Sequence, residues 1–176
     1  TVAAFAQGAV VGAYIQGFNT ENGVYVGGAL DWLTPFTVLT GLGLLAGYAL
    51  LGSTWLILKT EGRLQAWARR ITLPLLLCVL AVFVLISVWT PFVNEHVMER
   101  WFSNISLIWI LPLLAAACAF QIFRSVRKGF EAMPVVATMG LFVFTYLGLL
   151  VSRWPYVVPP EYTLWDAASA ANSQLF

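Results

Sequence analysis

Few side chains in this chain could carry acid–base, nucleophilic or metal chemistry, and they lie outside the long apolar runs. His96 is the only histidine, and it stands in a short polar segment beside Glu95 and Glu99. A metal or haem site needs additional ligands at suitable spacing. A lone imidazole in such a segment is more typical of a solvated surface residue than of a ligand.

The remaining candidates for chemistry are two cysteines and several serines. Cys78 and Cys118 stand inside apolar runs with no CxxC, haem-attachment or zinc spacing, so we expect them to behave as small buried hydrophobes. No serine has a histidine base in a pattern that suggests a catalytic triad. The residue types therefore predict no catalytic, cofactor-binding or metal-binding residue in this chain.

The composition indicates an integral membrane protein. Of the 176 residues, 60% are hydrophobic and 10% are charged, and the mean hydropathy is +0.83. Soluble domains are about a quarter charged. The net charge of +1 gives no strongly basic surface, so we expect no nucleic-acid partner. The first residue is Thr and an apolar run begins there, which suggests a piece of a longer protein.

Apolar segments of spanning length alternate with polar ones. The expected membrane spans are 1–18, 35–58, 71–93, 104–123 and 133–154. Thr163 and Asp166 have the spacing of a helix-capping box, which predicts the start of a further helix over 164–176. The fold class expected is all-α: one membrane domain over 1–176, a polytopic transmembrane helical bundle of about five spans plus the start of another.

The charges predict how the bundle is oriented. The segments 59–70 and 124–132, expected to be loops, hold seven of the nine Lys and Arg residues and two of the eight acidic residues. Positive charge favours the cytoplasmic side. We therefore expect both loops to be cytoplasmic, in a multi-pass protein that contacts the lipid bilayer.

The sharpest boundary between apolar and polar sequence falls near Lys59. Trp55 stands one turn earlier, at the depth where an indole favours the headgroup region. The Lys59 stem can bend back to place its ammonium group at the interface. Gly62 can end the helix, because glycine adopts left-handed backbone angles at little cost.

No Asp, Glu, Lys, Arg or His lies in the middle of an expected span, which argues against a proton or ion path made by this segment alone. Two hypotheses for the function are compatible with the residues: the chain is part of a secondary transporter, or it is a membrane scaffold with no attached enzyme. A transporter would show inverted repeats, broken helices and polar groups at mid-membrane. Only Pro112, inside the 104–123 span, favours it.

Three motifs, taken in order, resemble subunit II of the cytochrome bd-type quinol oxidases, including the cyanide-insensitive branch that shares this subunit. The resemblance covers residues 1–176. The motifs are Gly27-Gly28-x-x-Asp31-x-x-Thr34-Pro35-Phe36, Gly47-Tyr48-x-x-Leu51-Gly52-x-x-Trp55-Leu56-x-x-Lys59-Thr60-Glu61-Gly62, and Trp154-Pro155-x-x-Val158-Pro159 with Thr163-x-Trp165-Asp166-Ala167-Ala168-Ser169.

The resemblance implies the C-terminal portion of a non-haem subunit in a respiratory terminal oxidase of the bacterial inner membrane. That complex oxidises quinol, reduces oxygen to water and contributes to a proton gradient. Haem b and haem d are expected in the partner, the haem-bearing subunit I, and some members bind a structural quinone in subunit II. This chain would act mainly as a scaffold. The residues to which the resemblance assigns motif membership are Trp55, Lys59, Thr60, Glu61, Gly62, Trp165 and Asp166.

Overall fold

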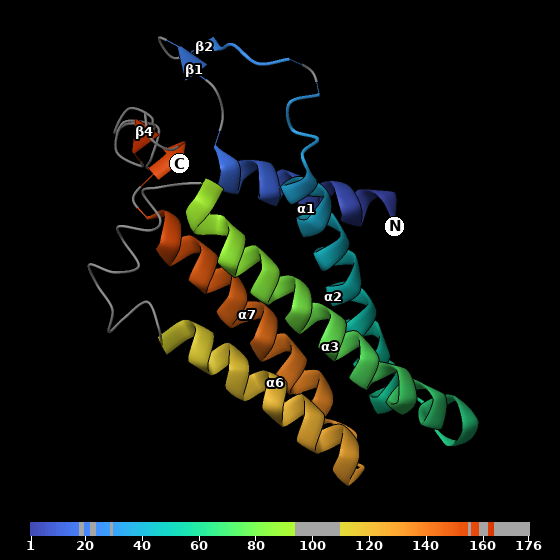
Figure 1. The fold of residues 1–176 in the computed structure, drawn as a ribbon. Coiled ribbons are helices and arrows are strands. Elements are labelled where there is room, and N and C mark those ends of the chain that lie inside the picture. Colours follow the sequence, from blue (N-terminus) through green and yellow to red (C-terminus); the bar gives the residue numbers. More distant parts are fainter. Residues whose placement is uncertain are drawn as a thin grey trace, which may run out of the picture.

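The structure, a computed structural model, is a bundle of helices (Figure 1). It describes residues 1–17, 20–21, 24–28, 30–93, 110–154, 156–158 and 162–163. The helices are α1 (Val2–Gln16), α2 (Pro35–Lys59), α3 (Gly62–Val93), α6 (Ile110–Lys128) and α7 (Met133–Arg153). The all-α fold class predicted from the sequence is confirmed.

Two small antiparallel ribbons lie in the connecting segments. One pairs β1 (Thr20–Glu21) with β2 (Val24–Tyr25), and the other pairs β3 (Tyr156–Val158) with β4 (Tyr162–Thr163). The first ribbon flanks the dipeptide Asn22-Gly23, which favours a two-residue hairpin connection. Neither ribbon belongs to the bundle, which is built from helices alone.

Four helices are long and apolar enough to cross a membrane: α2, α3, α6 and α7. They run along a common direction, with α1 lying across one end of α2 (Figure 1). The 15 residues of α1 rise about 22 Å, which is less than the roughly 30 Å hydrocarbon layer. The expected span over 1–18 is therefore met by a shorter apolar helix.

Two segments expected to be loops are largely helical, which corrects the sequence prediction. Helix α3 already begins at Gly62, and α6 continues to Lys128, so most of 59–70 and half of 124–132 belong to helices. The sequence argument equated charge with loop. Arg, Leu, Gln and Ala are all good helix formers, and α3 also buries Ala68 completely in this region.

Glycines bring α1 and α2 close together. Gly8 and Gly12, a pair of small residues one turn apart, are buried against α2. A Cβ atom added to Gly8 would stand 2.7 Å from the carbonyl oxygen of Thr40 and 2.8 Å from the Cα of Gly41. The two backbones are therefore in direct contact, as small-residue motifs in membrane helices allow.

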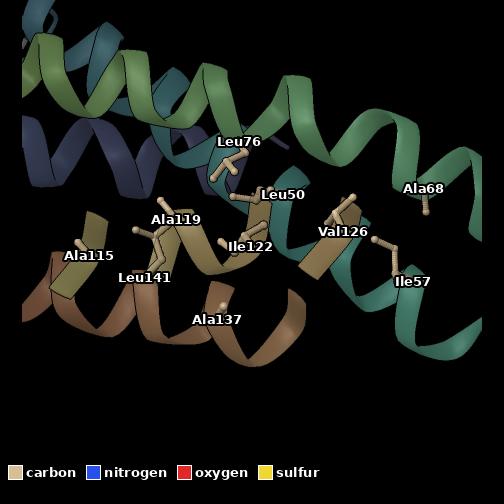
Figure 2. Close-up of a cluster of buried hydrophobic side chains, with 10 residues drawn as sticks. All are labelled: Leu50, Ile57, Ala68, Leu76, Ala115, Ala119, Ile122, Val126, Ala137 and Leu141. Carbon is tan, nitrogen blue, oxygen red and sulfur yellow. The ribbon is translucent and has the colours of Figure 1, made fainter. Parts of the chain in front are cut away.

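The core joins all four long helices (Figure 2). The small side chains of Ala115, Ala119 and Ala137 let α6 and α7 approach each other closely, and larger aliphatic side chains fill the space toward α2 and α3. The members of this core are Leu50 and Ile57 of α2, Ala68 and Leu76 of α3, Ala115, Ala119, Ile122 and Val126 of α6, and Ala137 and Leu141 of α7.

Several hydroxyl groups inside the bundle form hydrogen bonds within their own helix or to a neighbouring helix, whereas the buried Ser125 Oγ of α6 has no hydrogen-bond partner among the described residues. Thr72 Oγ1 of α3 lies 2.8 Å from the carbonyl oxygen of Ala68 and 3.0 Å from Ser53 Oγ of α2. At the other end, Thr34 and Thr37 form a capping box at the start of α2. Thr34 Oγ1 also donates to Gln16 Oε1 at 2.8 Å, and this hydrogen bond joins the end of α1 to the start of α2.

Candidate functional site

The end of α2 carries the residues that the sequence singled out. Trp55 and Lys59 lie one helical turn apart, and both are exposed. The Lys59 Nζ stands 5.6 Å from the centroid of the Trp55 ring. Such a cation–π contact at an exposed site contributes about 0.5–1 kcal/mol. It keeps the ammonium group beside the indole, in the arrangement expected of an interfacial anchor.

Thr60 terminates α2. Its backbone is extended, with φ −126° and ψ 162°. Its N–H donates to the carbonyl oxygen of Leu56 at 3.0 Å, and its Oγ1 donates to the same oxygen at 2.7 Å. These two donors satisfy one of the carbonyls that the end of a helix leaves without a partner.

Gly62 has a different position from the one predicted. It does not end α2, because that helix ends at Lys59; instead it is the first residue of α3 and has φ +65°. A Cβ atom at Gly62 would meet no atom within 4 Å, so glycine is favoured here by the backbone angle and not by space. Together with the exposed Glu61, it reverses the chain between α2 and α3.

Two α3 residues that the sequence analysis missed connect this turn to the one between α6 and α7. Gln65 Nε2 donates to the carbonyl oxygen of Ile57 at 2.9 Å and to Glu131 Oε1 at 3.2 Å. Arg69 Nη1 and Nη2 donate to the carbonyl oxygens of Phe130 and Gly129 at 3.1 and 2.9 Å. The signal for both was their four-residue spacing on one helix face, which becomes visible only once 62–70 is read as helix.

The side chains around the α2–α3 turn are better suited to a structural role than to catalysis. Among the described residues, no group of three or more His, Cys, Asp or Glu could hold a metal ion. Haem ligation would call for an imidazole or a sulfur ligand aimed at a ring-sized site. The described ranges contain no histidine, and their methionines, Met133 and Met139, are exposed on α7. Of the two cysteines, which were expected to be buried, Cys78 is exposed on α3 and Cys118 is half-buried on α6. The side chains of this region therefore do not fit a haem site.

Comparison with protein families decides the identity. The family model described as "Cytochrome bd terminal oxidase subunit II" matches residues 1–176, the whole chain. The chain belongs to this subunit II family. The resemblance drawn from the three sequence motifs is confirmed, and with four helices of spanning length the protein is a multi-pass membrane protein.

Curated relatives agree with the family model. The chain is 29% identical to "Probable cytochrome oxidase subunit 2" of Haemophilus influenzae, in an alignment that covers 96% of the chain and 54% of that relative. It is 23% identical to "Cytochrome bd-I ubiquinol oxidase subunit 2" of Escherichia coli K12, covering 93% of the chain and 52% of that relative. The chain spans about half the length of the relatives it matches.

Within this subunit II chain, the structure brings together the five motif residues from Trp55 to Gly62 at the α2–α3 turn. The other two motif residues, Trp165 and Asp166, lie outside the described residues, as do His96 and the helix expected over 164–176. Apart from Thr60, which caps α2, and Gly62, which does not end it, the roles of the motif residues stay predictions.

Proposed function

We propose that this chain is part of the non-haem subunit of a respiratory quinol:oxygen oxidoreductase, in which it acts as a scaffold for the haem-bearing subunit I. One observation carries the proposal. In the described helices, Asp, Glu and His do not occur, and Lys and Arg occur only in the first or last few turns. The cations are Lys59, Arg63, Arg69, Arg70, Arg124, Arg127, Lys128 and Arg153. The interior of this membrane region offers packing and a low dielectric, without groups for proton transfer.

In the proposed complex, quinol is oxidised and oxygen is reduced to water, with haem b and haem d of subunit I supplying the electron path. Protons taken up on the cytoplasmic side contribute to the gradient. The described residues of this chain would contribute indirectly, by presenting helix surfaces to the partner and to lipid. The name of the Escherichia coli relative, a ubiquinol oxidase subunit, supports quinol as the reductant of the complex.

The proposed location is the bacterial inner membrane, with the α2–α3 and α6–α7 turns in the cytoplasm. Both turns lie at the same end of the bundle, since Gln65 and Arg69 connect them. The cations of α3 and α6 gather at that end, and positive charge is retained on the cytoplasmic side.

A transporter is not favoured. The feature that suggested one was Pro112, which would break a helix at mid-membrane. The described residues Ile110–Lys128 form one continuous helix that includes Pro112, so the described part of α6 has no break at this proline. The long helices α2, α3 and α7 are continuous over their described lengths.

The proposal is tested by a reduced-minus-oxidised absorbance spectrum of the complex, captured through a tag on the full-length protein that carries this chain. We expect b-type and d-type haem signals to co-purify with a second, larger membrane subunit. A stable and colourless protein that purifies alone would contradict the proposed function.

The same preparation tests the interfacial anchor. Replacing Lys59 and Glu61 together by Leu removes both charges at the membrane boundary, and we expect a several-fold lower yield of assembled complex. The haem spectrum of the complex that does assemble should be unchanged, because these side chains act on insertion and not on haem. The charge-preserving pair Lys59→Arg and Glu61→Asp is the control and should assemble normally. An altered spectrum in the assembled Leu variant would contradict a structural role.

A further inference from the structure

An exposed stripe runs along α3 on the side that faces away from the other described helices. Its members recur at alternating steps of four and three residues, the spacing of one helix face. They are Arg63, Trp67, Arg70, Pro74, Leu77, Ala81, Val84 and Val88, and all are exposed. We refer to these eight residues as the α3 stripe.

The α3 stripe begins with two arginines that have no partner among the described residues. Arg63 and Arg70 make no hydrogen bond or ion pair there, whereas their neighbour Arg69 binds the carbonyls of the α6–α7 turn. Two helical turns, about 10.5 Å along the axis, separate Arg63 from Arg70. Trp67 lies between them and is 51% exposed. A guanidinium group can form two parallel hydrogen bonds to one phosphate group, and an indole favours the depth of the lipid headgroups.

This cationic end projects beyond the hydrocarbon layer. The 32 residues of α3 rise about 48 Å, which exceeds the layer by roughly 18 Å. The hydropathy of the helix places its apolar part after Arg70, so the first turns of α3 lie at headgroup depth. The two arginines are therefore positioned where lipid phosphates lie.

After Arg70, toward the C-terminal end of α3, the side chains of the α3 stripe are apolar and mostly large. Leu77, Val84 and Val88 are 66%, 57% and 61% exposed. Helix faces that pack on another helix in a membrane are rich in small residues, as the α1–α2 contact with its glycines illustrates. The α3 stripe has Ala81 as its one small residue, so it is better suited to flexible acyl chains than to a second helix.

We propose that the α3 stripe binds an anionic phospholipid. The phosphate headgroup lies between Arg63 and Arg70 with its glycerol region near Trp67, and an acyl chain lies along Leu77 and Ala81. The order of the stripe, cations followed by branched aliphatic side chains, matches the order of groups in such a lipid. This inference goes beyond the proposed function and does not depend on it.

The test uses the full protein in its assembled complex, titrated in detergent with phosphatidylglycerol or phosphatidylcholine and analysed by native mass spectrometry. We expect preferential retention of phosphatidylglycerol. The double variant Arg63→Gln, Arg70→Gln should lower that preference by about tenfold, and by roughly 30-fold at most, because each cation near an anionic surface contributes about 1 kcal/mol. The matched control is Arg124→Gln with Lys128→Gln on α6, which removes the same charge from the same end and should change the preference less than twofold.

A second measurement does not depend on how the arginine variants fold. Phosphatidylglycerol with brominated acyl chains should quench the fluorescence of Trp67, read as the difference between the parental complex and Trp67→Phe. If both double variants lost the preference for phosphatidylglycerol to the same extent, binding would depend on general surface charge, and the proposal would be overturned. Absence of any quenching of Trp67 would also overturn it, since a protein partner would then cover the stripe.

Discussion

Replacing Gly8 by Leu should prevent α1 from packing on α2 and sharply lower the yield of folded protein. Even a single added carbon would stand 2.7 Å from the Thr40 carbonyl oxygen and 2.8 Å from the Gly41 Cα. Both neighbours are backbone atoms, which cannot move aside as the end of a flexible side chain can. Overpacking a well-packed site costs about 1–3 kcal/mol, and we expect at least the upper value here. The measurement is the melting temperature and yield of the purified full-length protein.

The position of the glycine, and not the size of the new residue, should decide how far the melting temperature and the yield fall. Gly52 on α2 is exposed and has no atom within 4 Å of an added Cβ, so Gly52→Leu is the matched control and should be neutral or slightly stabilising. Gly8→Ala should fall between the parental protein and Gly8→Leu. If Gly8→Leu melted like Gly52→Leu, the close approach of α1 and α2 would be wrong.

Replacing Arg69 by Gln should loosen the contact between the two turns at the proposed cytoplasmic end. The guanidinium group donates to the carbonyl oxygens of Gly129 and Phe130 at 2.9 and 3.1 Å. A glutamine is shorter and uncharged, so it cannot reach both. Hydrogen bonds to charged groups contribute about 1.5–3 kcal/mol each, and partial exposure of Arg69 reduces this, so we expect a loss of about 2 kcal/mol in total.

This loss would appear as a melting temperature lower by several degrees and as faster proteolysis at the α6–α7 turn. Arg124→Gln is the matched control, because it removes the same charge at the same end of the bundle from an exposed side chain that makes no hydrogen bond or ion pair in the described part of the chain. It should leave the melting temperature nearly unchanged. Equal destabilisation by the two variants would show that general charge, and not the contact between the turns, is responsible.

The candidate site was predicted in part. Trp55 and Lys59 were expected at the boundary, and the structure places the ammonium group beside the indole. The end of α2 was expected near Gly62 but lies at Lys59, where Thr60 provides the cap. The error arose because a glycine shortly after a helix is typical of a C-terminal cap. Here the hydrogen bonds of Thr60 cap α2, and Gly62 takes its positive φ at the start of α3.

The sequence by itself determined that the chain is a helical membrane protein, where helices α2 and α7 begin and end to within one residue, and which family it belongs to. Those conclusions depend on hydropathy, on the distribution of Lys and Arg and on local motifs, all of which can be read directly from the sequence. Only the tertiary structure decided that Arg69 contacts Gly129 and that Gly8 contacts Thr40. These contacts join residues 60 and 32 positions apart. They depend on how each helix is rotated and crosses its neighbour, and the packing of whole helix faces sets that geometry.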